Sequence, residues 1–168
     1  LGEAPAADPV AAWRWLAACT GEGRPEAQQV AGGDYADGPF AVLVGSGENP
    51  AADAANQANA RRFLAAWTAR SHGEPPVLIN ARIDEPALAG RSLVCFGSPA
   101  SLPLLDRLFG RQGLPVEWTA REGREREGSR RWLRDTATCL LTLAHPRSPG
   151  RHILIVDGHD VGPLLGDG

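Results

Sequence analysis

Lysine and methionine are absent from this 168-residue sequence, and tyrosine occurs only once. All 17 basic residues are therefore arginine, and the formal net charge of −3 gives no general attraction to nucleic acid or to an anionic membrane surface. Because Met is missing, we expect the chain to be a processed product or an excised domain. A hydrophobic content of 43% with 22% charged residues suits one globular domain with a real core.

Patterns typical of metal sites, disulfide frameworks and membrane helices are also lacking. Cys19, Cys95 and Cys139 form no CxxC or Cys–His spacing, so we expect buried small side chains, although a bridge between two of them stays open. The four histidines lack i, i+4 spacing, so no metal is predicted. No run reaches the roughly 18 apolar residues that a membrane helix needs. The sequence does not indicate a compartment.

The N-terminal segment carries the signature of a helix start. Asp8 as N-cap and Pro9 at the first helical position predict a helix over residues 10–18. A glycine-rich connector follows it. We therefore expect residues 1–38 to be an N-terminal helix and connector packed on one domain formed by residues 39–168.

Apolar runs and helical patterns alternate from residue 40 onward. Strands that are apolar on both faces and separated by helices are typical of a parallel sheet covered on both sides. We predict a three-layer αβα sandwich with a mostly parallel, Rossmann-like sheet. The predicted strands are 40–44, 77–80 and 93–96, with helices at 50–70 and 102–109 and a helical turn at 84–88. In the first helix, a 3.6-residue period predicts a core stripe of Ala60, Phe63, Leu64 and Trp67.

The last third of the chain leaves no room for crossover helices. Predicted strands at 139–143 and 153–156 have hairpin spacing, so we expect antiparallel strands at one edge of the sheet. Predicted strands at 116–120 and 130–133 flank a charged, Gly-containing turn, and the arginine-rich run 121–134 covers this turn and the second strand. Its interleaved glutamates favour an exposed hairpin with cross-strand charge pairs over nucleic-acid binding.

Two glycine loops follow predicted strands, Gly45–Asn49 and Gly97–Ser101. Parallel strands end at a common edge, so we expect both loops to form one polar cleft there, with Asn49 and Ser98 as helix N-caps. The first loop lacks the GxGxxG motif and the P-loop lysine, and Glu48 would repel phosphate. These features disfavour nucleotide or flavin binding at Gly45–Gly47, which stays an alternative. The predicted ligand-binding residues are Gly45, Ser46, Gly47, Asn49, Ser98 and Ser101.

A small serine hydrolase is the rival interpretation. Ser46 would be the nucleophile, and His159, just past the last predicted strand, would be the base. The strained G-x-S-x-G elbow of α/β-hydrolases is missing, because position 44 is Val. We therefore favour no catalysis in this chain alone and expect no cofactor.

Four segments occur in this order: PFAVLVGSGENPAADAANQANARRF, RSLVCFGSPASLPLLDRL, LPVEW and LAHPRSPGRHILIVDG. Together they resemble the flavodoxin-like domain appended to some bacterial α/β-hydrolases of the prolyl-oligopeptidase or esterase kind. The resemblance spans residues 39–158, although Leu102 stands where the family has Asn. It implies an accessory domain without activity of its own, whose partner is a hydrolase domain. We expect docking to that partner, or binding of a small or carbohydrate-like ligand at the glycine-loop edge.

Overall fold

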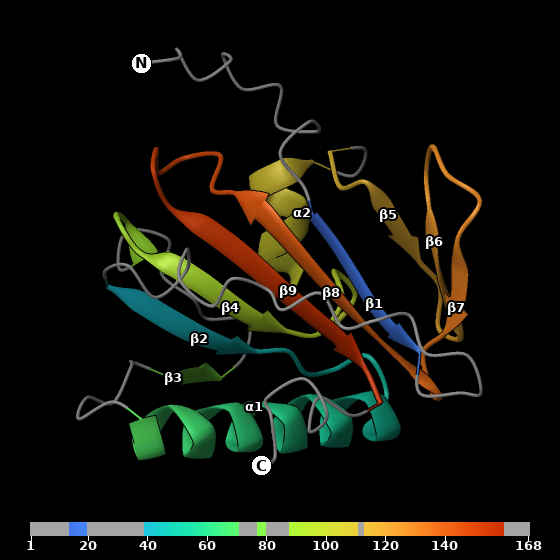
Figure 1. Ribbon diagram of the computed structural model, residues 1–168, viewed down its shortest axis with the longest axis horizontal. Helices are drawn as coiled ribbons and strands as arrows, with labels where there is room; N and C mark the ends of the chain where they lie inside the picture. The colour runs from blue at the N-terminus through green and yellow to red at the C-terminus, as the bar shows by residue number, and fades with distance from the viewer. Residues whose placement is uncertain (1–13, 20–38, 71–76, 80–87, 111–112, 160–168) are drawn as a thin grey trace.

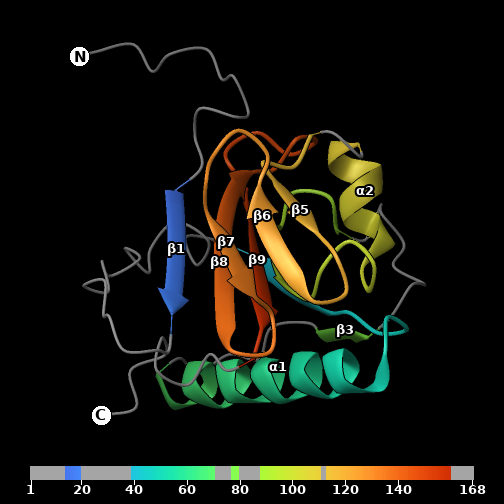
Figure 2. The same cartoon turned by 90° about the vertical axis from the view of Figure 1, so that its right-hand side faces the viewer.

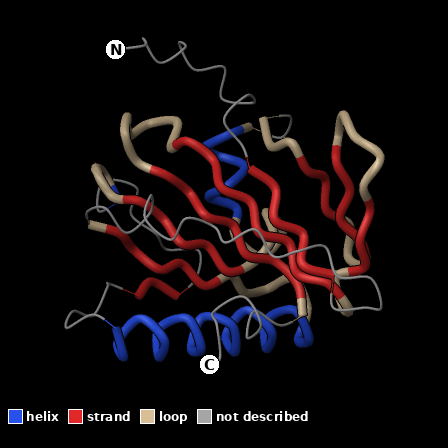
Figure 3. Tube along the Cα trace, viewed as in Figure 1, coloured by secondary structure: helices blue, strands red, loops and turns tan. Residues whose placement is uncertain are grey.

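A computed structural model describes residues 14–19, 39–70, 77–79, 88–110 and 113–159 (Figure 1). These residues form an α/β fold with a mixed six-stranded sheet, a separate three-stranded sheet and two helices (Figure 3). The strands of the large sheet are β1 (Arg14–Cys19), β2 (Phe40–Val44), β3 (Val77–Ile79), β4 (Ser92–Phe96), β8 (Ala137–Ala144) and β9 (His152–Gly158). The other elements are α1 (Pro50–Arg70), α2 (Pro103–Phe109), β5 (Val116–Trp118), β6 (Glu122–Glu125) and β7 (Arg131–Leu133).

The large sheet has the order β1-β8-β9-β4-β2-β3. Strands β3, β2, β4 and β9 are parallel, whereas β8 is antiparallel to both β9 and β1. The predicted antiparallel edge is thereby confirmed. From β2 the chain goes to β3 on one side and then to β4 on the other, so the strand order reverses between β2 and β4. Ligand crevices in open α/β sheets lie at such a switch point.

Helix α1 covers one face of the large sheet along the predicted stripe (Figure 1). Ala60 and Phe63 are buried, and Leu64 and Trp67 pack against the same cluster. Phe40 contacts the ring of Trp67 edge-on, with centroids 4.8 Å apart. The predicted stripe is confirmed, and it fixes the N-terminal end of α1 beside the carboxyl ends of β2 and β9.

The opposite face is covered by α2 together with the small sheet, which Figure 2 shows beside each other. The predicted all-helical layer is therefore replaced in part by β structure. Trp132 joins the small sheet to this face, because its buried ring belongs to the core cluster of the large sheet. The ring also lies against Gly123 of β6, where a Cβ would meet the indole at 2.2 Å.

Glu117 and Arg124 are register partners on β5 and β6 and form a cross-strand ion pair. The predicted hairpin of 116–120 with 130–133 is wrong, because β6 lies between β5 and β7. The sequence does not predict β6, because its four residues, EGRE, show no alternation of apolar side chains.

The predicted helix over residues 10–18 is wrong where it can be compared with the structure. Residues Arg14–Cys19 form β1, which pairs antiparallel with β8 from Arg14↔Thr142 to Cys19↔Ala137. Strand β8 would otherwise present a row of unpaired backbone groups, and pairing with that edge overrides a local capping signal. Residues 1–13 and 20–38, Asn80 and most of the predicted turn 84–88 lie outside the described residues.

Two of the three cysteines are buried, as expected. Cys95 and Cys139 are buried and free, and burial raises the pKa of both thiols. The side chain of Cys19 lies outside the described part. Neither helix of the described chain is long and apolar enough to cross a membrane.

Candidate functional site

The two glycine loops lie against each other at the switch point, as predicted. The Gly45 N–H donates to Phe96 O at 2.8 Å, and the Ser46 N–H donates to Ser101 O at 3.1 Å. A Cβ on Gly45 would lie 2.4 Å from Ser101 Oγ, and one on Gly97 would lie 2.3 Å from the same atom. Glycine at both positions is therefore required by the close approach of the loops.

Asn49 caps α1 as predicted, with Pro50 at the first helical position. Its Oδ1 accepts a hydrogen bond from the Ala52 N–H at 2.9 Å. Asp53 in the first turn accepts the Gly47 N–H with both carboxylate oxygens, each at 2.9 Å. An acidic residue there also suits the positive end of the helix dipole. The helix start is thus fixed by its own local sequence.

The backbone donors of the first glycine loop are used within the protein. The N–H groups of Gly45, Ser46 and Gly47 donate to Phe96 O, Ser101 O and the Asp53 carboxylate. A phosphate cradled there would have to displace these acceptors, one of which is itself anionic. The loop geometry therefore gives no support to nucleotide or flavin phosphates at Gly45–Gly47.

Ser98 and Ser101 are buried and close the second loop. Ser98 Oγ donates to Glu48 Oε2 at 2.8 Å, and Ser101 Oγ donates to Ser98 O at 3.1 Å. The predicted N-cap role of Ser98 is wrong, because α2 begins later, at Pro103, with Leu102 in the cap position and no side-chain cap. Ser98 O instead accepts the N–H groups of Ser101 and Leu102, which makes a turn before the helix.

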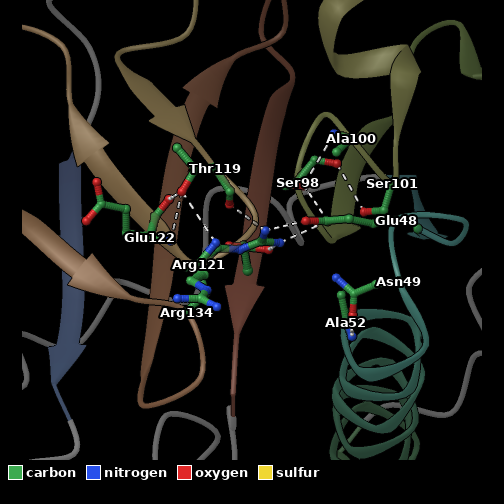
Figure 4. A network of polar contacts seen from close by, with 12 residues as sticks. Glu48, Asn49, Ala52, Ser98, Ala100, Ser101, Thr119, Arg121, Glu122 and Arg134 are labelled. Carbon is green, nitrogen blue, oxygen red and sulfur yellow. Dashed lines mark hydrogen bonds and ion pairs between the residues drawn. The ribbon is translucent and has the colours of Figure 1, made fainter.

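A buried ionic cluster, Glu48–Arg134–Asp157, joins the first loop, the small sheet and β9 (Figure 4). Arg134 Nε and Nη2 donate to the two Asp157 oxygens at 2.9 and 2.7 Å. Its Nη1 and Nη2 contact the Glu48 carboxylate, and Nη1 also donates to Thr119 O at 2.9 Å. All five guanidinium N–H donors are therefore used. The side chains are 1% to 8% exposed, so this Arg is a structural link.

Burial acts on the three charged groups of this cluster in opposing ways. Burial acts to raise the pKa of Glu48, but hydrogen bonds from Arg134 and Ser98 outweigh it, and the net pKa lies below its ordinary value. In Asp157, which is more deeply buried, desolvation wins and the pKa is raised despite Arg134. The Arg134 pKa is raised by its two carboxylates against the cost of burial. The guanidinium therefore stays charged.

A small pocket of about 180 Å³ lies beside this cluster, between the first turns of α1 and the end of β9. We call it the α1–β9 pocket. Amide side chains come from Asn49 and Asn56, and an exposed imidazole comes from His159. Asn56 is held in place because its Nδ2 donates to Gly45 O at 3.3 Å. The other lining residues are Ala51, Ala52, Ala55, Ala120, Arg134, Asp135, Asp157 and Gly158.

Of the residues predicted from the sequence, this pocket brings together Asn49 and His159. Ser46, Ser98 and Ser101 do not belong to its described lining, which contains no hydroxyl or thiol side chain. Both oxygens of Asp157 accept from Arg134. Within the described ranges no group of three His, Cys, Asp or Glu side chains could hold a metal ion.

Sequence reasoning missed Asn56 and Arg134. Arg134 lies in a run that looks solvated, yet it is two residues after Trp132, and strand alternation places both on one face. That alternation was the available signal. Asn56 could have been found from its position nearly two turns after Asn49, on the face of α1 towards the loop.

Fold and site together define an α/β domain with a pocket of mixed polar and apolar lining at the carboxyl ends of its parallel strands. The pocket belongs to the switch-point edge, where such folds place ligands. No family model, curated protein or solved structure matches the chain.

Proposed function

We propose that this chain is a non-catalytic accessory domain that binds a small, neutral, hydroxyl-rich ligand such as a sugar ring in the α1–β9 pocket. The observation that carries this proposal is the character of the lining. Asn49 Oδ1 caps α1, so Asn49 offers Nδ2 as a donor. Asn56 Nδ2 donates to Gly45 O and Ser101 Oγ, so Asn56 offers Oδ1 as an acceptor. His159 adds an accessible ring nitrogen. The small volume limits the ligand to about the size of one ring.

Local charge favours a neutral ligand over a phosphate. Glu48 and Asp157 carry two negative charges against the one positive charge of Arg134, and Asp135 on the pocket wall adds another negative charge. All Arg134 donors are already used. An anionic ligand would therefore meet repulsion without a free guanidinium to pair with. Nucleotide or flavin phosphates fit this pocket poorly.

The accessory role rests on the absence of a covalent nucleophile from the described lining and on the family resemblance. Asp157 is committed to Arg134, so it cannot orient His159 as the acid of a triad would. The parallel strand order β3-β2-β4-β9 supports the flavodoxin-like, three-layer architecture that the resemblance implies. The corresponding partner is a hydrolase domain. In this scheme the pocket binds part of the substrate of the hydrolase domain, and the reaction itself takes place in that domain.

The first prediction is selective binding of neutral sugars at this pocket. Calorimetric titration with a panel of neutral monosaccharides should give saturable binding, which Asn49→Asp and His159→Ala weaken. Asp retains the N-cap of α1, so Asn49→Asp removes the amide without removing the cap. Gln57→Glu is the matched control, because Gln57 is an exposed amide of α1 outside the pocket lining. It should bind as the unsubstituted chain does.

Two outcomes would reject the proposal in favour of its rivals. Covalent labelling of Ser46 by a fluorophosphonate probe, abolished by Ser46→Ala, would show a serine hydrolase. A rise in melting temperature with FMN or nucleotides but not with sugars would show phosphate-ligand binding, because a ligand stabilises the state to which it binds.

A further inference from the structure

A second pocket, of about 310 Å³, lies at the opposite ends of the parallel strands from the α1–β9 pocket. We call it the α2 pocket. Its lining residues lie near the beginnings of β4 and β9, whereas the lining of the α1–β9 pocket includes the end of β9. Four leucines form the apolar part of the wall, and His145 and Arg147 form a polar end. The leucines are Leu88, Leu93, Leu104 and Leu108.

Hydrogen bonds fix the segments that surround this pocket. The Gly90 N–H donates to Ser148 Oγ at 3.3 Å, which joins the turn before β4 to the β8–β9 loop. Arg147 Nη2 donates to Arg107 O at 3.1 Å, which joins that loop to α2. The three walls are therefore tied to one another, and the pocket is preformed. A preformed cavity of roughly 300 Å³ or more with a few polar groups is typical of small-molecule sites.

His145 offers a hydrogen-bond donor at the polar end. The residue is 8% exposed, and its Nδ1 accepts the Arg147 N–H at 3.1 Å. Burial, together with the Arg147 charge, lowers the His145 pKa, which keeps the ring neutral. A neutral ring that accepts at Nδ1 carries its proton on Nε2, so Nε2–H is a donor.

The charges of the lining indicate the ligand class. Arg147 brings a cation to the pocket, and no acidic residue occurs in the described lining. An apolar chain against leucines with a negative group near Arg147 and His145 satisfies both halves of this surface. We propose that the α2 pocket binds a small aliphatic monocarboxylate, with its chain on the leucines and its carboxylate at His145 and Arg147. This site is independent of the proposed sugar site.

The test uses octanoate, with octylammonium as a ligand of the same chain length and opposite charge. Titration calorimetry on the full chain should show one saturable octanoate site and no octylammonium binding. Arg147→Gln should weaken octanoate by about tenfold or more, since hydrogen bonds to charged groups are lost. Arg130→Gln, on a 62% exposed side chain of the β6–β7 loop, should leave binding unchanged. In amide NMR spectra, octanoate shifts should cluster at Ala89, Leu108 and Ser148.

Several results would overturn the proposal. Equal binding of octanoate and octylammonium would mean that the leucines act alone, without charge recognition. An unchanged octanoate affinity in Arg147→Gln would show that Arg147 does not bind the carboxylate, provided that the melting temperature of the variant shows a folded chain. Leu108→Trp gives a second check on a partly buried residue, because the larger side chain should fill the pocket and abolish binding. Shifts elsewhere, or no saturation at millimolar octanoate, would also reject the site.

Discussion

The hydroxyl of Ser101 lies where a side chain at either Gly45 or Gly97 would begin. The two glycines differ, however, because only Gly97 of this pair has a left-handed φ, of 127°. A Cβ there would meet Asn56 Nδ2 at 2.8 Å as well as Ser101 Oγ at 2.3 Å. Gly97 is therefore restricted by both its backbone and its surroundings, and it lies next to an amide that lines the α1–β9 pocket.

Substitution of Gly97 by Ala should lower the free energy of unfolding by about 3 kcal/mol or more, from backbone strain and steric overlap together. Gly47→Ala is the matched control. Gly47 has φ 91°, but nothing lies within 4 Å of its added Cβ, so the expected cost is about 1–2 kcal/mol of strain alone. Urea denaturation measures both. Equal losses of unfolding free energy in the two variants would show that contacts with Asn56 and Ser101 do not restrict position 97.

The ionised Glu48 carboxylate should make stability pH-dependent. Its folded-state pKa lies below the ordinary value of a glutamate because the hydrogen bonds from Arg134 and Ser98 outweigh desolvation. The stability it adds is therefore fully present above its ordinary pKa and is lost as pH falls through the lower folded value. Denaturant unfolding from about pH 7 to about pH 3 should show the wild-type advantage over Glu48→Gln shrinking on acidification. A gap that is constant or grows would contradict this account.

At the scale of elements, Arg134 joins the end of β7 to β9 and to the loop before α1. A buried ion pair is costly to desolvate, but removing one partner leaves uncompensated charge behind. Because Arg134 satisfies two carboxylates and Thr119 O, its removal affects all three segments at once. The small sheet is thereby held over the large one and against the α1–β9 pocket.

Replacement of Arg134 by Met should cost about 3–5 kcal/mol, because Glu48 and Asp157 would stay buried without their cation. The triple variant Glu48→Gln, Arg134→Met, Asp157→Asn should recover most of that loss by removing the orphaned charges. Arg131→Met, on an exposed residue of β7, should stay within about 0.5 kcal/mol. Thermal unfolding compares the three variants. A similar small effect for Arg134→Met and Arg131→Met would mean that the cluster does not stabilise the fold.

Elements defined by local signals could be predicted, and elements defined by distant partners could not. Helix α1 begins at Pro50 because Asn49 accepts the N–H of Ala52 in its first turn, and Asp53 accepts the N–H of Gly47 in the preceding loop. Strand β1 depends on the edge of β8, more than a hundred residues away, and its local signal favoured a helix. Strand β6 is charged, and its inward position is a glycine over Trp132, so no apolar alternation marks it.

At the scale of the whole molecule, the two pockets at opposite ends of the parallel strands differ in their chemistry. The edge of the candidate sugar site could be predicted because parallel strands followed by glycine loops end together, and Asn49 and His159 were singled out. The rest of that pocket could not, because Asn56 and Arg134 reach it only through the packing of α1 and the small sheet. The α2 pocket depends on β8–β9 loop contacts that no local pattern encodes.

The central claim is that the α1–β9 pocket binds a small neutral ligand without chemistry. An amide NMR titration of the full chain with neutral monosaccharides tests it most directly. Saturable shifts should cluster at Asn49, Asn56 and His159, with Gln57→Glu behaving as wild type and Asn49→Asp losing the response. Shifts confined to other surfaces, or an unchanged spectrum at millimolar sugar, would contradict the claim.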